Sequence, residues 1–141
     1  MPDQNPPEYT HGLAELIRSH RLYMGLSKDG MADRLGMSIR SYERIESGAR
    51  DCPPGLLDHI ETVSGEFDDA VGTLIGLATA EEGLYTVEKK LTVSFTSEFR
   101  HEWMRAVSGR AAVLSGLVMP ILTDGTPRDT SWEKKRGIGV S

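Results

Sequence analysis

The stretch SKDGMADRLGMSIRSYERIESG, which runs from Ser27 to Gly48, decides the fold. It holds two short amphipathic segments with Gly36 between them. Ser27 and Ser38 each stand directly before one segment, where a serine side chain accepts a hydrogen bond from the first turn of a helix. Gly36 lies where the chain must turn sharply, and glycine adopts positive φ at little steric cost. We therefore predict two capped helices joined by a tight turn.

The inward positions of both segments fit a helix-turn-helix unit. Ala32 lies in the middle of the first segment, where a small side chain lets the second helix cross close above it. Tyr42 and Ile45 are three residues apart, so they share the inner face of the second helix. We expect this second helix to run from Ser38 to Ser47. Two helices joined by a few residues around a glycine define the helix-turn-helix motif.

The outward side chains of the second helix are suited to DNA. They form a cluster that a major groove can accept, made of Ile39, Arg40, Ser41 and Arg44. Arg40 and Arg44 lie one helical turn apart, and each guanidinium can donate two hydrogen bonds to guanine O6 and N7. Ile39 can contact a thymine methyl group. The alternative is a solvated helix face on which the arginines have Glu43 as a neighbour.

Other side chains of the same stretch are expected to meet phosphates. Lys28, Ser41 and Arg50 would position the motif on the duplex without reading its sequence. For Lys28 the alternative is a solvent-exposed lysine in a first helical turn. The full set of expected DNA contacts is Lys28, Ser38, Ile39, Arg40, Ser41, Tyr42, Arg44 and Arg50.

These residues resemble the phage-repressor and Cro-type helix-turn-helix family over roughly residues 10–65. The resemblance rests on LSKDGMADRLGMSIRSYERIESG, with its capped helix, Ala, Leu-Gly, Ser cap and Ile-Glu-x-Gly. It implies that Lys28 lies at a phosphate- and base-contacting position of the first motif helix. It also implies a buried ion pair between Arg21 and Glu46, which would hold the motif at a fixed angle.

Two residues depart from that family. Gly30 stands where the family usually has Glu, and a glycine inside a helix costs about 1 kcal/mol relative to alanine. Tyr42 replaces the usual Val or Ile at an inward position. Its hydroxyl needs water or a partner, so we expect either plain core packing or an extension to the DNA backbone.

The charge of the chain is unevenly distributed. The 141 residues carry a net charge of −5, which argues against a general polyanion binder. The window from His11 to Arg50 nevertheless has seven basic and five acidic residues, a net of +2, so the remainder carries −7. The N-terminal part is therefore the basic side of the protein.

The rest of the chain predicts a mainly α fold. Apolar spacing predicts a first helix from Thr10 to Gly25, a fourth opened by Pro53-Pro54 and a fifth capped by Asp68 or Asp69. Alternation in KLTVSF predicts a strand over Leu91–Phe95, and a long helix should follow from Ser97 until Pro120. We thus expect a five-helix, repressor-like helix-turn-helix domain followed by a strand and a long helix that form a dimerisation element.

Four parts of the chain follow from these patterns. Residues 1–9 are expected to be disordered, 10–82 to form the DNA-binding domain, 83–122 to form the strand-helix dimerisation region, and 123–141 to be a flexible tail. A lone strand leaves N–H and C=O groups unpaired. We therefore predict a homodimer through the Leu91–Phe95 strand and the helix that carries Trp103. The alternative is pairing with Tyr85–Val87 of the same chain.

The second half of the chain is similar to the small dimeric regulators associated with anti-CRISPR operons. The similarity rests on the order of elements and on the pattern W-x-x-x-x-S-x-x-A-A, which is Trp103, Ser108, Ala111 and Ala112 here, after Phe95. It implies an autorepressor of a small operon.

Several other classes are disfavoured. The sequence has no Gly-rich phosphate loop, nucleophile elbow or HExxH motif, so we expect no enzyme. Its four histidines lack metal-ligand spacing with the single cysteine, so we expect neither a metal nor a cofactor. No stretch is suited to crossing a membrane, and the single cysteine fits the cytoplasm.

We predict a repressor of phage or operon origin that binds double-stranded DNA. The competing hypotheses are an antitoxin-type protein whose C-terminal half binds a protein partner and an interaction module that binds no DNA.

Overall fold

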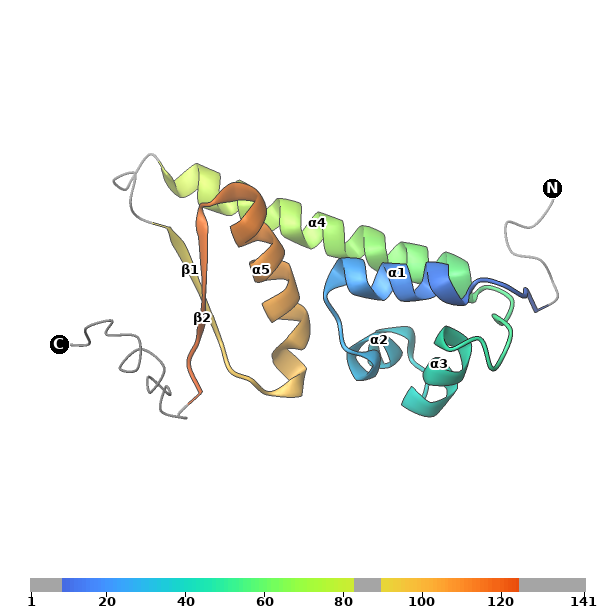
Figure 1. Ribbon diagram of the computed structural model, residues 1–141. Helices are drawn as coiled ribbons and strands as arrows, with labels where there is room; N and C mark the ends of the chain where they lie inside the picture. Colours follow the sequence, from blue (N-terminus) through green and yellow to red (C-terminus); the bar gives the residue numbers. More distant parts are fainter. Residues whose placement is uncertain (1–8, 83–89, 125–141) are drawn as a thin grey trace, which may run out of the picture.

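The computed structural model describes residues 9–82 and 90–124, and Figure 1 shows how their elements are arranged. These residues form five α-helices, one 3-10 turn and two strands. The mainly α fold, with a helix-turn-helix unit before a strand and a helix, is confirmed. The expected disorder of residues 1–9 and the expected flexible tail fall almost wholly outside the described residues.

The first three helices have the boundaries that their caps dictate. They are α1 (Ala14–Met24), α2 (Lys28–Leu35) and α3 (Ile39–Glu46). The Ser27 side chain accepts a hydrogen bond from the Gly30 N–H, and the Ser38 side chain accepts one from the Ser41 N–H. Gly36 ends α2 with φ of 68°, in the left-handed region. The predicted serine caps and the glycine turn are therefore confirmed.

A single helix, α4 (Leu56–Glu82), takes the place of the expected fourth and fifth helices. The break expected at Asp68 or Asp69 is wrong, because the buried stripe passes through this point without changing its spacing. Its members lie three, four or seven residues apart and are Ile60, Val63, Phe67, Val71 and Ala78. Asp68 is exposed and accepts a hydrogen bond from the Tyr23 hydroxyl at 2.7 Å, so it does not cap a helix.

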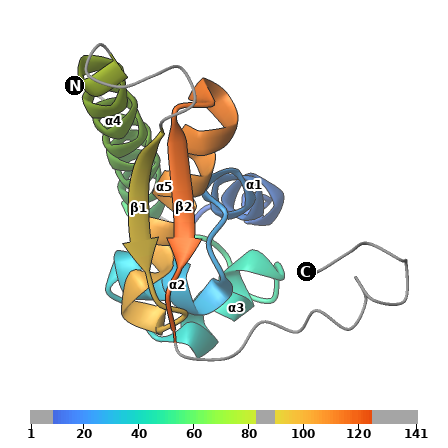
Figure 2. The ribbon, with the colours of Figure 1, turned by 90° about the vertical axis from the view of Figure 1, so that its left-hand side faces the viewer.

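The C-terminal unit is a strand-helix-strand arrangement. Strand β1 (Leu91–Phe95) leads through η1 (Phe99–His101) into α5 (Glu102–Ser115), and β2 (Val118–Leu122) follows. The strands are parallel, with Leu91 opposite Val118 and Phe95 opposite Leu122. Figure 2 shows the two strands side by side in front of the helices.

The pairing of β1 with β2 corrects the expectation that the strand has no partner in the described part of its own chain. The long helix ends at Gly116 with φ of 68°, and Pro120 lies within β2 instead of ending the helix. The alternative partner, Tyr85–Val87, lies outside the described residues. Within the part of the chain that the structure describes, the outer edges of β1 and β2 are not paired with a further strand.

The two halves of the molecule share one core. Helix α4 extends from α1 to α5 along one side of the molecule (Figure 1). The rings of Phe67 on α4 and Trp103 on α5 meet edge to face, with 5.6 Å between their centroids. Ser108 and Ala111 are fully buried, so their small side chains lie at the packed face of α5. Arg110 donates a hydrogen bond to the Tyr23 carbonyl of α1 at 2.6 Å.

Candidate nucleic-acid interface

Helix α3 has one face in the core and one face open. Tyr42 and Ile45 are fully buried, and the carboxylate-bearing Glu46 is nearly so. Arg40 and Arg44 are exposed on the other side. The same 3.6-residue period that buries Tyr42 and Ile45 therefore presents both arginines to solvent.

Both arginines are free to bind a ligand. Within residues 9–82 and 90–124, neither guanidinium has a hydrogen bond or an ion pair with a side chain. Glu43, which is exposed on the same helix, forms no ion pair with either arginine in the described part of the chain. Because the two residues are four apart, their side chains leave the same side of the helix.

The neighbours of the arginines complete this surface. Ser38 is exposed at the start of α3, and its hydroxyl donates to the Ser41 hydroxyl at 2.9 Å. Ser41 is half-buried. Ile39 is also half-buried and packs against the core, which leaves part of its side chain outside. In the major groove, thymine presents a methyl group and guanine presents two acceptors. An apolar side chain beside two guanidinium groups can contact both kinds of base.

Lys28 and Arg50 are exposed cations on other elements. Lys28 is the first residue of α2, where the positive end of the helix dipole disfavours a cation. An anion bound nearby would offset this cost. Arg50 follows α3, and its guanidinium donates to the Tyr9 hydroxyl at 3.2 Å. Lys28 thus lies on the first motif helix and Arg50 after the second.

A buried ion pair fastens α1 to α3, as the resemblance implied. Arg21 Nη2 and Glu46 Oε1 are 2.7 Å apart, and the two side chains are only 12% and 5% exposed. Arg21 also donates to the Leu26 carbonyl at 3.0 Å. Burial is the largest single influence on Glu46 and raises the pKa of its carboxyl group. The hydrogen bonds and charge of Arg21, together with smaller contributions from the Tyr42 hydroxyl and the Lys28 charge, outweigh burial, so the pKa is lowered. The pair holds α3 at a fixed angle to α1.

Tyr42 is part of the core and offers no surface to DNA. Its exposed fraction is 0%, which corrects the expectation that its hydroxyl extends to the DNA backbone. The hydroxyl lies beside the Arg21–Glu46 pair without a well-formed hydrogen bond to a described residue. Burial and the neighbouring Glu46 carboxylate raise the pKa of Tyr42. The side chain therefore stays neutral and serves packing.

The residue that the sequence analysis missed is Tyr9. It lies at the end of a Pro-rich stretch that we expected to lack structure, and no local pattern marks it. Thr10 and Cys52 exchange backbone hydrogen bonds of 2.9 and 3.0 Å, which brings Tyr9 to the loop after α3. The Arg50 guanidinium lies 5.7 Å from the centre of the Tyr9 ring. Tyr9 therefore restrains the rotamer of Arg50.

The comparison with protein families agrees with this geometry. Residues 13–65 match the family model of a helix-turn-helix domain. These residues form a helix-turn-helix domain. The match supports a helix-turn-helix family without singling out the phage-repressor and Cro type. A search of the curated proteins finds no match to the chain. Domains of this kind are DNA-binding modules of regulators, with the second motif helix in the major groove.

Membrane spans and metal clusters are both absent from residues 9–82 and 90–124. None of its helices is long and apolar enough to span a membrane. In the same residues, no group of three or more His, Cys, Asp or Glu side chains is arranged to hold a metal ion.

Proposed function

We propose that this protein is a sequence-specific, DNA-binding transcriptional regulator that reads a palindromic operator as a dimer. The observation that carries the proposal is the exposure of Arg40 and Arg44 on the outer face of α3, where neither has an ion-pair partner among residues 9–82 and 90–124. Arg40 and Arg44 contact guanines, and Ile39 contacts a thymine methyl group. Lys28, Ser38, Ser41 and Arg50 contact phosphates and set the orientation of the helix-turn-helix domain.

The parallel register of β1 and β2 supports a homodimer built on one strand edge. The Leu91 N–H donates to the Leu117 carbonyl and the Thr123 N–H donates to the Phe95 carbonyl. In a parallel ladder, alternate residues of a strand bond to the same neighbour. The backbone groups of Thr92 and Ser94 on β1 therefore point to the edge away from β2, as do those of Pro120 on β2.

The two edges differ in their capacity to pair. Proline has no N–H, so Pro120 removes a donor from the outer edge of β2. Thr92 and Ser94 retain both backbone groups on the outer edge of β1. We therefore assign the dimer contact to β1, as the isolated strand pattern suggested. Trp103 packs edge to face against Phe67 of its own chain, so the proposed contact rests on the strand and not on this side chain. Helix α5 supports the sheet from one face.

A dimer of this kind acts as a repressor by occupying its site. Two copies of α3 that meet successive major grooves lie about 34 Å apart. Occupation of a promoter at this spacing excludes other proteins from the same DNA. An autorepressor of a small operon is the simplest regulator of this design.

Selection of bound sites from a pool of random duplexes tests the proposal. The expected product is a motif with inverted symmetry, whose half-sites contain guanines and lie about one helical turn apart. Recovery of no enriched sequence, together with equal retention of all duplexes, would contradict sequence-specific binding. Enrichment of a single asymmetric half-site would contradict the dimer but would still support sequence-specific DNA binding.

A further inference from the structure

The start of α2 is held by a carboxylate from the C-terminal unit. Glu102 Oε1 accepts a hydrogen bond from the Ser27 backbone N–H at 2.5 Å. Glu102 Oε2 accepts a second one from the Ser27 hydroxyl at 2.8 Å. The Ser27 oxygen in turn accepts from the Gly30 N–H at 3.0 Å. A residue 75 positions away thus takes part in the cap of the first motif helix.

This arrangement has the hydrogen bonds of a capping box. In a capping box, the N-cap serine bonds the backbone N–H of the third helical residue. A Glu or Gln at that third position bonds the N–H of the serine in return. Here the third helical residue is Gly30, which has no side chain to return the bond. Glu102 of α5 supplies the missing carboxylate.

Gly30 leaves room for this carboxylate. A Cβ atom built on Gly30 would lie 2.8 Å from Glu102 Cδ and closer still to Oε1. Any side chain at position 30 would therefore push Glu102 away from Ser27. The close approach of Glu102 accounts for a glycine at this helical position, although glycine costs stability in an isolated helix.

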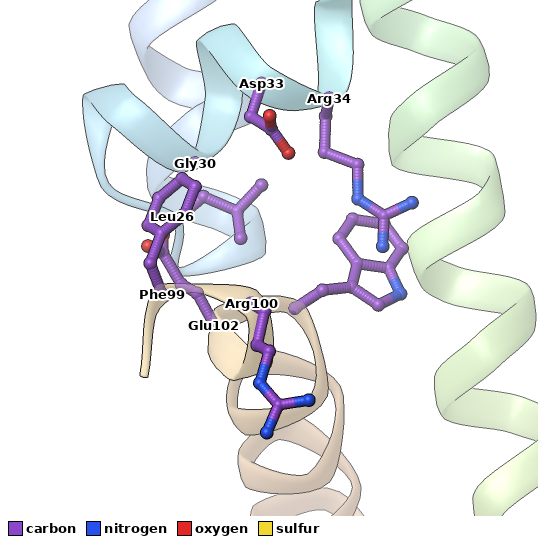
Figure 3. Close-up of a pocket in the computed structure, with 8 residues that line it drawn as sticks. Leu26, Gly30, Asp33, Arg34, Phe99, Arg100 and Glu102 are labelled. Atoms are coloured by element: carbon purple, nitrogen blue, oxygen red, sulfur yellow. The ribbon is translucent and has the colours of Figure 1, made fainter. Parts of the chain in front are cut away.

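Further contacts between α2 and α5 lie next to the Glu102–Ser27 hydrogen bonds. The Arg34 guanidinium lies 3.5 Å from the centre of the Trp103 ring. Figure 3 shows Asp33 and Arg34 of α2 facing the segment that carries Phe99 and Glu102, with Gly30 and Leu26 next to them. Between these residues lies a cavity of about 500 Å³. Glu102 is thus the hydrogen-bonded part of a broader α2–α5 contact.

We infer that Glu102 is a positioning residue that completes the capping box of α2 from the C-terminal unit. The first turn of α2 is then ordered more strongly while α5 is docked against α2. This makes the geometry of the motif depend on the half of the chain that carries the sheet. The consequence for DNA affinity rests on the proposed function, whereas the cap itself does not.

A set of four variants tests the cap without DNA. Glu102→Ala should speed hydrogen exchange at the Ser27 and Gly30 amides and lower the melting temperature by about 4 °C. Glu102→Gln should stay close to the wild type, because Gln also serves in a capping box. Gly30→Glu alone should destabilise, since its side chain meets Glu102. Gly30→Glu combined with Glu102→Ala should restore the wild-type exchange rates and melting temperature, because the glutamate at position 30 then supplies the capping carboxylate.

The double variant shows whether Glu102 caps α2 or only packs against it. If the double variant shows the sum of the two single losses, Glu102 has no capping role and the inference is overturned. If Glu102→Ala leaves exchange at Ser27 unchanged, the inference is overturned as well. Arg100→Ala is the matched control, because Arg100 lines the same cavity, pairs with Glu98 of its own segment and supplies no capping atom, so exchange at Ser27 should not change.

Binding to the duplex recovered by selection extends the test to function. Glu102→Ala should weaken binding about two- to fivefold with an unchanged salt dependence. The reason is that α2 has its ordered, binding-competent conformation in a smaller fraction of the molecules. The double variant should restore the affinity. Tighter binding with a steeper salt dependence would overturn the inference, because the carboxylate would then be opposing a phosphate. If the selection recovers no duplex at all, the proposed function fails. The hydrogen-exchange measurements then still test whether Glu102 caps α2.

Discussion

Arg40 and Arg44 differ from the other exposed arginines of the helix-turn-helix domain in what surrounds them. Arg18 is paired with Glu15, and Arg50 is held by Tyr9. The two α3 arginines have no such partner among the described residues. A guanidinium without a competing intramolecular partner loses little when it turns to a base.

Replacement of either α3 arginine should reduce sequence reading. Arg40→Ala or Arg44→Ala should each weaken binding to the selected operator by about 1–3 kcal/mol and relax the preference at one base pair per half-site. Competition titrations against operators substituted at each position measure both effects. Arg18→Ala, an exposed arginine on α1, is the matched control and should bind like the wild type.

Loss of a phosphate contact should have a different signature. Lys28→Ala should weaken binding to all sequences alike and reduce the slope of log K against log salt by about 1. A sequence-selective loss for Lys28→Ala would contradict its assignment to phosphate. Unchanged operator preference in both α3 variants would contradict the assignment of base contacts to Arg40 and Arg44.

The buried ion pair makes the stability of the domain depend on pH. Because the pKa of Glu46 is lowered in the folded state, its contribution is present above the unfolded pKa of about 4.3 and is lost as the pH falls through the folded pKa. Glu46→Gln should lower the free energy of unfolding by about 3–5 kcal/mol near pH 7, since it leaves Arg21 without its charged partner.

Unfolding curves at several pH values check this prediction. The difference between wild type and Glu46→Gln should narrow as the pH falls below about 4.3, the unfolded pKa, and the wild-type carboxyl group becomes protonated. Glu15→Gln is the control, because Glu15 is 80% exposed and its pairing with Arg18 should contribute little. A difference that stays constant with pH would contradict the electrostatic role of Glu46.

At the scale of elements, local signals were predicted well and distant ones were not. The serine caps and Gly36 act within a few residues, so the sequence alone was sufficient to predict α2 and α3. The unbroken α4 was misjudged because Asp68 and Asp69 are good cap residues, yet the buried stripe runs past them. Strand β2 was missed because an apolar run that contains Pro120 has no period of its own, and its partner is 27 residues away in register. The Glu102 cap could not be predicted, since its two ends are 75 residues apart.

Glycines within α4 allow a test at this scale. Nothing lies within 4 Å of a Cβ atom built on Gly65 or Gly72. Gly65→Ala and Gly72→Ala should each stabilise the protein by about 0.5–1 kcal/mol, because alanine loses less backbone entropy on folding. Thermal unfolding measures the gain.

Gly36→Ala is the contrasting variant. It should destabilise by about 1–2 kcal/mol, because an alanine at φ of 68° is strained. Loss of stability in the α4 variants would indicate that this surface of the helix is covered in solution.

At the scale of the whole molecule, the proposed dimer depends on the outer edge of β1. Thr92→Pro removes an N–H that points to this edge and leaves the β1–β2 hydrogen bonds in place. It should shift the protein from dimer to monomer in sedimentation experiments and weaken operator binding. Met119 and Ile121, which are 42% and 39% exposed on the outer face of the sheet, need not be altered.

A proline on the other strand provides the control. Leu122→Pro removes an N–H from the outer edge of β2, the edge that Pro120 already weakens, at a side chain that is 49% exposed, and should leave the dimer intact. A monomeric Leu122→Pro together with a dimeric Thr92→Pro would reverse the assignment of the edges. A wild-type protein that sediments as a monomer at all concentrations would exclude the dimer.

Helix α4 has a consequence for the choice of operators. Its 27 residues extend for about 40 Å, and it packs against both α1 of the helix-turn-helix domain and α5 of the C-terminal unit. In the proposed dimer, two arms braced in this way cannot adjust their reach or their rotational phase. One extra base pair between half-sites separates them by about 3.4 Å and turns them by about 35°. Gel-shift assays should therefore show that this single insertion reduces affinity to that of an isolated half-site, whereas a protein with hinged arms would tolerate it.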